Sequence, residues 1–437
     1  MKKIFNFFII LIALALFFTG CNSTAKPNDS TEDEAKPTSA PTETEKPTET
    51  EKPDNREANS VFSEDFGKYT VVVDDAADGD LKTMAKNLTD TVNACWGVTT
   101  TLVYDKGIEI GKYEILVGDT DRPETKEFKA SLKDGECGYG VIGRKIVILG
   151  TEDQYTEKAV VLFANFILHE KSATARKYMT EKNAHTVDAT NMISVMSYNI
   201  QVGNSDNNPA TVTAMIRNYM PDILGVQEAD GEWMTVLDGR LSKNGYAYVG
   251  VGRDSNGKGE RSAIFYRADK LELIDSKTLW LSATPDEVSR VEGSLCNRIV
   301  TMATFKRISD GKVFVHANTH LDHSNATVRS QQVAFLDQYV KEFADGKQFL
   351  TTGDFNFQPD NRVYKQLMDL GYENCGQLAK YARGREDNTF TGGSMIDFCF
   401  RHGGKDFEPY FYTVCDELIS GKVPSDHHPI FLMLELK

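Results

Sequence analysis

The sequence predicts an α/β protein with two folded parts that follow a long polar stretch. In the first part, 60–191, β-branched runs that end in Gly or Asp alternate with stretches whose apolar residues are three and four positions apart. In the second part, 192–437, many short strand-like runs are separated by fewer helical patterns. With 437 residues, of which 40% are hydrophobic, the chain can bury a core in each part.

The N-terminus has the pattern of an export signal. Lys2 and Lys3 precede an apolar run from Ile4 to Phe18, and small residues stand before Cys21. The ending "FTGC" resembles the lipobox of bacterial lipoproteins, in which the cysteine is diacylated and becomes the new N-terminus, although leucine is usual where Phe18 stands. We predict a lipoprotein signal peptide over 1–20 and an exported chain, anchored through lipid on Cys21 to the outer face of the cell membrane. An uncleaved anchor helix is the alternative, but the run is short for a full span.

The next stretch, 21–59, is almost free of large apolar residues and repeats Thr-Glu-Lys-Pro. Such a composition cannot bury enough surface to fold, and its prolines and charges keep it extended. We predict a disordered tether that holds the folded parts away from the membrane.

The charge and the cysteines argue against two kinds of function. A formal net charge of −15 argues against strong nucleic-acid binding, which depends on clustered Lys and Arg, although a small site for phosphates is compatible with it. The six cysteines after Cys21 are scattered, without the close pairs of a zinc site. Nothing in the sequence predicts an oligomeric state.

The pattern of 60–191 predicts a small α/β domain, and this part has no recognisable set of catalytic residues. Its strand-like runs include "YTVVVDD" and "YEILVGD", and "TEKAVVLFANFILHE" is helical. It faintly resembles the accessory domains that precede catalytic domains in exported carbohydrate enzymes. We expect His169 to lie at a helix end.

The candidate chemistry lies in 192–437, where "LTTGDFNFQPD" illustrates the pattern. Asp354 and Asn356 follow an apolar run two positions apart, and in an extended segment their side chains would point to the same side. Such a pair could hold a phosphate or a metal-bound water. It could equally form an Asx turn, since Gly, Asp, Asn and Pro are the usual turn residues.

Other strand-like runs of this part also finish in polar residues, which in chain order are Asn199, Glu228, Glu260, His320, Asp354, Asn356, Asp397, Asp426 and His427. Their motifs "SYNI", "QE", "GERSAIFYR", "NTHLDH", "GDFN", "MID" and "SDHHPI" resemble, in order, those of the endonuclease/exonuclease/phosphatase superfamily, the deoxyribonuclease I-like proteins. The resemblance implies a four-layer α/β sandwich, in which two mainly antiparallel sheets lie face to face with helices outside. It also implies a site where strands of both sheets end.

The resemblance further implies that Glu228 binds a divalent cation, with Asn199 and Asp426 nearby. Oxygen ligands of this kind suit Mg²⁺, with Mn²⁺ or Ca²⁺ as substitutes, and disfavour zinc. Asp426 is alternatively a structural carboxylate of its loop.

Hydrolysis of a phosphate ester needs activated water and a stabilised phosphoryl charge. His427 is the candidate base or phosphate contact, with Asp397 as the carboxylate that fixes its tautomer. Asp354 and Asn356 would orient the water and hold a phosphate oxygen. The choice of base between Asp354 and His427 stays open at this point.

A second pair, Glu260 with His320, resembles the arrangement of the deoxyribonuclease and sphingomyelinase branches. Arg298, in a loop beside the site, is a candidate contact for substrate phosphate, with a surface ion pair as the alternative. Structural roles are expected for three further histidines, His316, His323 and His428, because "KVFVHANTH" lacks the helical spacing of paired metal ligands.

These observations predict a surface-anchored, Mg²⁺-dependent phosphoesterase whose substrate is a phosphodiester or phosphomonoester, such as a lipid headgroup, a sugar phosphate or a small metabolite. The alternatives are an extracellular nuclease, which the acidic chain disfavours, and a non-catalytic binding protein with a degenerate site.

Overall fold

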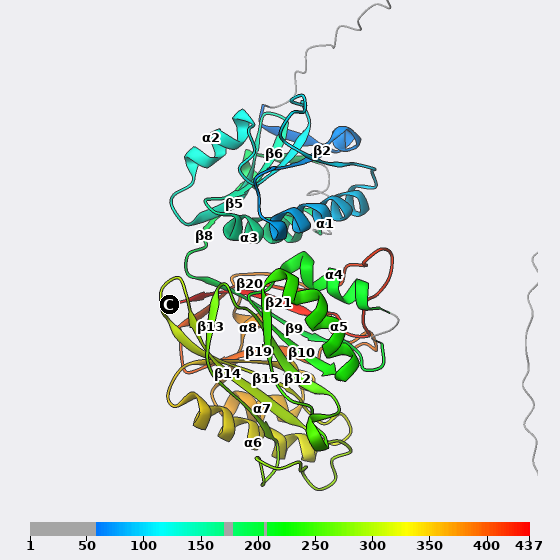
Figure 1. Ribbon diagram of the computed structural model, residues 1–437, viewed down its shortest axis with the longest axis vertical. Helices are drawn as coiled ribbons and strands as arrows, with labels where there is room; N and C mark the ends of the chain where they lie inside the picture. The colour runs from blue at the N-terminus through cyan, green and yellow to red at the C-terminus, as the bar shows by residue number, and fades with distance from the viewer. Residues whose placement is uncertain (1–57, 170–177, 205–207) are drawn as a thin grey trace, which may run out of the picture. The chain divides into compact units, whose positions relative to one another are not determined.

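The computed structural model describes residues 58–169, 178–204 and 208–437 (Figure 1). The internal contacts divide the chain into Met1–Asn55 and Arg56–Lys437, and every element below belongs to the second unit. The predicted signal peptide, the lipidation of Cys21 and nearly all of the predicted tether lie outside the described residues. Among the residues that the structure describes, no helix has both the length and the apolar character that crossing a bilayer requires.

A six-stranded sheet is built from the chain between residues 70 and 188. Its order is β3-β2-β4-β6-β5-β8, with β2 parallel to β3 and β4, β4 parallel to β6, and the last two pairings antiparallel. The strands are β2 (Thr70–Val73), β3 (Leu102–Tyr104), β4 (Glu114–Val117), β5 (Glu136–Ile142), β6 (Lys145–Gly150) and β8 (His185–Asp188). The helices are α1 (Gly79–Trp96), α2 (Pro123–Ser131) and α3 (Asp153–Phe163), and β1 (Ser60–Phe62) pairs with β7 (Tyr178–Thr180).

Helix α1 shows why these residues form these elements. Asp78 caps its N-terminus by accepting a hydrogen bond from the N–H of Leu81, and Gly97 ends it with φ = 68°, a left-handed value that glycine adopts easily. The buried side chains recur at three and four positions and face the core: Leu81, Met84, Ala85, Leu88, Thr89 and Val92.

Two further sheets are built from the chain between residues 192 and 436. The seven-stranded sheet has the order β11-β12-β10-β9-β21-β20-β18 and comprises β9 (Met192–Asn199), β10 (Ile223–Ala229), β11 (Tyr246–Val249), β12 (Arg261–Arg267), β18 (Tyr381–Arg383), β20 (Phe407–Val414) and β21 (Ile430–Leu436). The six-stranded sheet has the order β13-β14-β15-β16-β19-β17 and comprises β13 (Leu271–Trp280), β14 (Ile299–Arg307), β15 (Val313–His320), β16 (Phe349–Asp354), β17 (Tyr372–Asn374) and β19 (Asp397–His402). The helices are α4 (Pro209–Tyr219), α5 (Gly231–Leu241), α6 (Ala326–Ala344), α7 (Arg362–Asp369) and α8 (Cys375–Leu378).

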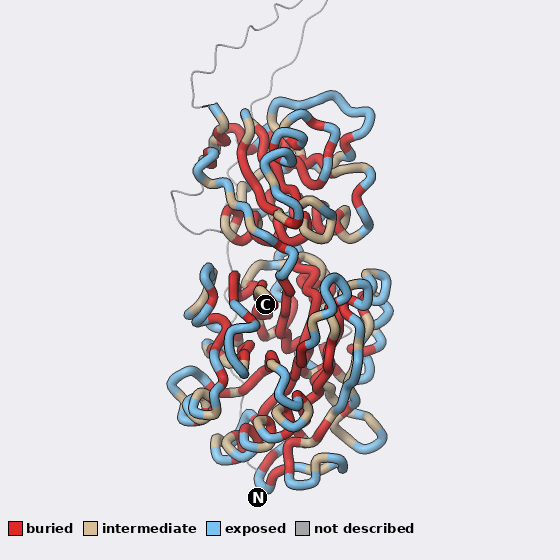
Figure 2. The backbone as a smooth tube through the Cα atoms, turned by 90° about the vertical axis from the view of Figure 1, so that its left-hand side faces the viewer, coloured by how far each residue is buried: buried red, intermediate tan, exposed pale blue. Residues whose placement is uncertain are grey.

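Alternating side chains of these strands divide the interior into layers, and the buried residues are red in Figure 2. In β9, Ile193 and Val195 belong to the core between the two sheets, whereas Met196 and Tyr198 belong to the core shared with α4 and α5. On the second sheet, the outward side chains pack against α6 and α7. The order of layers is therefore helix, sheet, sheet, helix, which confirms the predicted four-layer α/β sandwich and the smaller α/β part before it (Figure 1).

The internal contacts do not separate 60–191 from 192–437, because one hydrophobic core contains side chains from both. Buried ion pairs add to this continuity: Lys158 of α3 lies 3.2 Å from the Asp222 carboxylate, and Lys270 lies 3.1 Å from the carboxylate of Glu157 in α3. The sheets nevertheless belong to one part or the other. The predicted boundary between 191 and 192 stays a prediction.

Candidate active site

The polar ends of the strands meet at one edge of the space between the two sheets. The parallel pairing of β15 with β16 places His320 opposite Asp354, and the antiparallel pairing of β16 with β19 places Asp354 opposite Asp397. Asn199 ends β9 in the facing sheet, and His427 belongs to the turn that precedes β21. All five side chains are buried. The alternation of β9, β15, β16 and β19 therefore places the polar side chain at one end of each strand in the same layer.

Asn199 connects the two sheets at this edge. Its Nδ2 donates to Glu228 Oε1 at 2.9 Å and to Asp354 Oδ2 at 3.1 Å, and it lies 3.4 Å from His427 Nε2. An amide group has two N–H donors, and here both are directed at carboxylates. The side chain thereby fixes the separation of Glu228 and Asp354.

Glu228 occupies an irregular point of β10. Its φ is 61°, and the pairing of β10 with β12 shifts register between Val226 and Ala229. The Glu228 Oε2 accepts a hydrogen bond from the N–H of Val202 at 2.8 Å. A left-handed glutamate costs conformational energy, and such outliers cluster at functional sites. The bulge directs this carboxylate toward Asn199.

Asp397 and His427 form the predicted pair, with 2.9 Å between His427 Nδ1 and Asp397 Oδ2. Burial lowers the pKa of His427, but Asp397, Asp354 and Asp426 together raise it to about 10. Burial and the neighbouring Asp397 raise the pKa of Asp354. The geometry thus holds an imidazolium among carboxylates, with Nε2 3.8 Å from Asp354 Oδ2.

Asp354 and Asn356 do not share the extended geometry that the sequence pattern suggested. The strand ends at Asp354, and Asn356 has φ = 53°. The Asp354 Oδ1 accepts the N–H of Asn356 at 3.0 Å, and Asn356 Nδ2 donates to the carbonyl of Leu321 at 3.1 Å. The Asx turn that the sequence left open as the alternative is therefore confirmed, because the Asp354 carboxylate accepts the backbone N–H two residues on.

Within the described residues Glu260 and His320 make no direct hydrogen bond, and the catalytic role of this pair stays a prediction. Glu260 is bound through both oxygens by Arg253, at 2.8 and 2.5 Å, whereas His320 Nε2 lies 3.4 Å from Asp354 Oδ2. A guanidinium fork matches a carboxylate better than an imidazole does. The pKa of His320 is lowered well below its usual value by burial and by Arg298 and Arg253, so His320 is neutral.

Arg298 is buried beside this group, with only 4% of its surface exposed. Within the part of the chain that the structure describes, its Nε and Nη1 have no hydrogen-bond partner, and its Nη2 lies 3.3 Å from His323 Nδ1. Glu228, Glu260 and His320 line the same hollow. Burial and the nearby Arg253 lower the pKa of Arg298. A buried guanidinium with unmet donors is not the surface ion pair that was the alternative, and it suits an anionic ligand.

The donor atoms around Glu228 fit a divalent cation. Burial raises the pKa of Glu260 and of Asp426, and the charge of Glu228 raises each further. Carboxylates are hard oxygen ligands of the type that Mg²⁺ or Ca²⁺ prefers, whereas Asn199 turns its Nδ2 toward Glu228 while its Oδ1 accepts the N–H of Gln201 at 3.1 Å. Asp426 is half-buried, and its Oδ1 is 3.4 Å from Ser425 Oγ.

One compact group of three candidate ligands occurs among the residues described. It consists of Asp354, Asp397 and His427, whose ligand atoms all lie within 4.8 Å of one another. This group differs from the predicted set of Glu228, Asn199 and Asp426, and Asn199 joins the two sets through its contacts with Glu228 and Asp354.

Residues 196–427 match the model of the endonuclease/exonuclease/phosphatase family. The chain belongs to this family. Family members are hydrolases that act on phosphoesters. Solved structures agree with the match. An endonuclease/exonuclease/phosphatase family protein from Bacteroides thetaiotaomicron is 28% identical with a TM-score of 0.52, and the alignment covers 56% of this chain and 97% of that one.

A mannosyl-6-phosphatase of Bacteroides thetaiotaomicron VPI-5482 is also 28% identical, with a TM-score of 0.51 over 55% of this chain and 99% of that one. Among curated proteins, Nocturnin of Drosophila melanogaster is 30% identical over 165 residues, which are 35% of this chain. The chain spans about a quarter of the length of that relative, since 24% of Nocturnin is covered.

Sequence reasoning missed Arg253, which lies in the loop before β12. The N–H of Arg253 donates to the carbonyl of Glu260 at 3.0 Å, so the loop closes by backbone and side-chain bonds together. A signal was present, because opposite charges flank the Gly-rich "RDSNGKGE".

Sequence reasoning also missed a buried polar layer beneath the site. Asn318 donates to the carbonyls of Val226 and Ala263, each at 2.9 Å, and accepts from Gln227 at 2.7 Å. A Cβ at Gly225 would approach Asn318 Oδ1 to 2.7 Å, so glycine is needed for the sheets to come this close. The layer joins β10 to β15 across the space between the two sheets, below Glu228 and His320.

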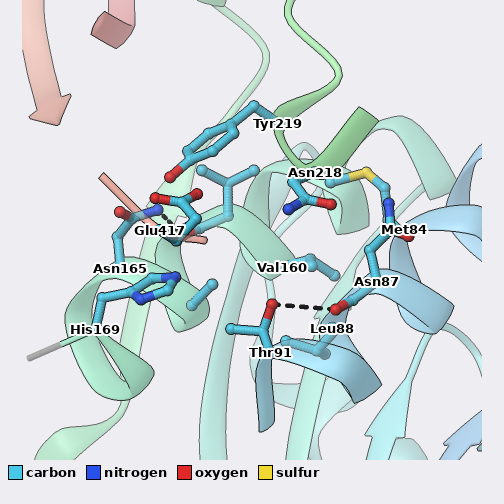
Figure 3. Close-up of a pocket in the computed structure, with 12 residues that line it drawn as sticks. Met84, Asn87, Leu88, Thr91, Val160, Asn165, His169, Asn218, Tyr219 and Glu417 are labelled. Carbon is cyan, nitrogen blue, oxygen red and sulfur yellow. Dashed lines mark hydrogen bonds between the residues drawn. The ribbon is translucent and has the colours of Figure 1, made fainter. Parts of the chain in front are cut away.

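Another hollow of the molecule, shown in Figure 3, is lined by residues that include Asn87, Thr91, His169 and Glu417. His169 caps the helical turn Ala164–Leu168, which confirms its predicted place at a helix end. Thr91 Oγ1 donates to the carbonyl of Asn87 at 3.0 Å (Figure 3). The compact ligand group lies elsewhere, so we place the candidate active site at the strand ends.

Proposed function

We propose that the protein is a divalent-metal-dependent hydrolase of small phosphoesters, with a sugar phosphomonoester as the favoured substrate class. The observation that carries this proposal is the convergence of buried and half-buried polar side chains from both sheets beside a buried guanidinium whose Nε and Nη1 have no partner among the described residues. The side chains concerned are Asn199, Glu228, His320, Asp354, Asp397, His427 and Arg298.

In this proposal Glu228 is the chief metal ligand, with Asn199 and Asp426 beside it and Mg²⁺ as the cation. Mn²⁺ and Ca²⁺ are substitutes, because the carboxylates of Glu228 and Asp426 offer hard oxygen ligands. When bound, the cation would supply Lewis-acid stabilisation of phosphoryl charge. Asn199 keeps the Glu228 carboxylate at a fixed place relative to Asp354.

We assign the proton acceptor to Asp354 and the phosphate contact to His427. Asp397 holds Nδ1 of the imidazole at 2.9 Å, and Nε2 faces the region of Asp354 and Asn199, where its N–H can donate to a phosphoryl oxygen. The Asp354 carboxylate is fixed by Asn199 and by the Asx turn of Asn356, so it is oriented for an attacking water. Arg298 binds the substrate phosphate.

Two observations support a small phosphomonoester as substrate. The mannosyl-6-phosphatase is similar to this chain over 99% of the phosphatase's own length. The net charge of −15 on this chain disfavours a polyanionic substrate. The full chain should therefore release phosphate from sugar phosphates and from a generic aryl phosphate in Mg²⁺, and should degrade plasmid DNA poorly at physiological salt.

The measurement is the initial rate on each substrate, with Mg²⁺ and with a chelator. A bis-aryl phosphodiester in the same series separates diesterase from monoesterase activity. Rapid plasmid degradation at that salt would favour the nuclease alternative. A protein that binds phosphate without cleaving any of the substrates would favour the non-catalytic alternative.

We also propose that the enzyme acts outside the cell, anchored to the outer face of the membrane by lipid on Cys21. The apolar run before "FTGC" and the Pro-rich segment after it support this proposal. In cell fractionation, the wild type should sediment with membranes and Cys21→Ser should not. Recovery of both proteins in the same fraction would contradict the anchor.

A further inference from the structure

The buried carboxylate of Asp322 joins two segments of the chain. Its Oδ1 accepts from the N–H of Ser324 at 2.9 Å, from Ser324 Oγ at 2.8 Å and from the N–H of Asn325 at 3.0 Å. Its Oδ2 accepts from Ser294 Oγ at 2.9 Å and from the N–H of Leu295 at 3.2 Å. Oδ1 thus accepts hydrogen bonds from the turn before α6, and Oδ2 accepts them from the loop before β14.

Both segments carry polar groups of the candidate site. The turn follows His320 directly and contains His323, and the loop ends at Arg298, three residues after Leu295. Arg298 Nη2 lies 3.3 Å from His323 Nδ1, so the two segments also meet at the site. Asp322 is therefore a second link between the turn and the loop that carries Arg298.

The charge of Asp322 makes this link strong. Burial raises the pKa of Asp322, but the donors from Ser324, Ser294 and Leu295 lower it to about 2. The group is thus an anion at neutral pH, and its hydrogen bonds are charge-assisted. On the other side of the loop, Asn297 Nδ2 donates to Asp254 Oδ1 at 2.9 Å.

The hydrogen bonds to Asp322 restrict the movement of the loop that carries Arg298. A buried guanidinium whose Nε and Nη1 lack partners gains hydration if its loop moves toward water. Leu295 is 61% exposed, so packing of its side chain contributes little to holding the loop. The hydrogen bonds to Asp322 oppose that movement.

We propose that Asp322 is a positioning residue that holds the loop before β14 so that the Arg298 guanidinium is placed for the phosphate group of the substrate. This inference rests on the proposed function, since it takes phosphate as the ligand of Arg298. The alternative is that Asp322 only shapes the turn that begins α6 (Ala326–Ala344).

The two oxygens of Asp322 allow these roles to be separated. Asp322→Asn keeps one oxygen for the turn, but the amide that replaces the other oxygen cannot accept a hydrogen bond from Leu295. The probe is inorganic phosphate, titrated calorimetrically into the full chain in Mg²⁺ buffer. Four proteins are compared: the wild type, Asp322→Asn, Arg298→Met and the double variant.

We expect Arg298→Met to weaken phosphate binding by about tenfold or more, the scale of a lost hydrogen bond to a charged group. Asp322→Asn should weaken it severalfold. The double variant should bind no more weakly than Arg298→Met alone, because a positioning residue has no effect once the group that it positions is gone. A purely structural Asp322 would give losses that multiply.

The inference is overturned if folded Asp322→Asn binds phosphate as the wild type does, if the losses multiply, or if the wild type binds no phosphate. Hydrolysis by the same preparations tests the proposed function separately. A wild type that follows the expected binding cycle but cleaves no phosphoester would contradict the proposed function and leave the role of Asp322 standing.

Asp310→Asn is the matched control. Asp310 is also a hydrogen-bonded carboxylate whose pKa is lowered to about 2, but its partners are Arg307 and Lys312 in the hairpin that joins β14 to β15. Phosphate affinity should not change in this variant. If Asp322→Asn shows no cooperative melting, Ser294→Ala replaces it, because this change removes a donor of the loop and leaves the turn intact. Unchanged phosphate affinity in folded Ser294→Ala would also overturn the inference.

Discussion

Asp397→Ala and His427→Ala are each expected to lower kcat by about 10²-fold or more, the usual scale for groups in acid–base and charge-stabilising roles. The double variant should be little worse than the more damaging single one. The physical reason is that the Asp397 carboxylate acts through the imidazole that it holds at 2.9 Å, so its contribution disappears with that imidazole. The measurement is kcat on the best phosphomonoester, with circular dichroism to verify folding.

His428→Ala is the control for this pair. His428 follows His427 directly, and its N–H donates to the carbonyl of Thr389, a backbone bond that the substitution leaves in place. Its kcat should stay close to that of the wild type. Losses that multiply in the double variant would mean that Asp397 and His427 act independently, and the assignment of the pair would then be wrong.

Glu228→Gln is expected to lower kcat at least about 10²-fold at a fixed Mg²⁺ concentration and to raise the Mg²⁺ concentration needed for half-maximal activity. A neutral amide removes one charge from the ligand set, and a bound cation contributes several kcal/mol of charge stabilisation to phosphoryl transfer. Asn199 can still contact the remaining oxygen, so the fold should survive.

Glu272→Gln is the matched control for this change, because Glu272 is an exposed glutamate whose partner is Lys306. Its Mg²⁺ titration should coincide with that of the wild type. An unchanged Mg²⁺ titration in Glu228→Gln would exclude Glu228 as the chief ligand. The compact group of Asp354, Asp397 and His427 would then be the better candidate for the cation.

The strand-end residues could be predicted from the sequence because their placement follows from alternation. Asn199, His320, Asp354 and Asp397 each occupy an end of a strand with buried neighbours, and a period of two decides which layer such a residue faces. The four-layer architecture followed from the order of the motifs. These features need only local pattern and the topology of the family.

The sequence pattern does not specify the local geometry of Asn356 and Glu260. Asn356 leaves the strand direction because the Asp354 carboxylate accepts its N–H, a local competition that overrides extended geometry. Glu260 is bound by Arg253 instead of His320, since loop closure brings a better partner seven residues away. Which of several nearby polar groups binds a given carboxylate depends on the three-dimensional positions of all of them.

Asp322 and Asn318 illustrate a third limit. Both stand in "NTHLDH" beside a candidate catalytic histidine, yet their roles come from bonds to segments far along the chain, Ser294 for Asp322 and Val226 for Asn318. Contacts at such separations are set by tertiary packing. The sequence marks these residues as polar and leaves their partners unspecified.

The most direct test of the central claim is the rate of phosphate release from a sugar 6-phosphate by the full chain, measured for the wild type and Glu228→Gln across a Mg²⁺ titration that begins in excess chelator. The account predicts no turnover in chelator, Mg²⁺-dependent turnover by the wild type, and a response of Glu228→Gln that is lower and shifted to higher Mg²⁺. Undiminished turnover in chelator, or identical titrations for the two proteins, would contradict a metal-dependent phosphoesterase site at these strand ends.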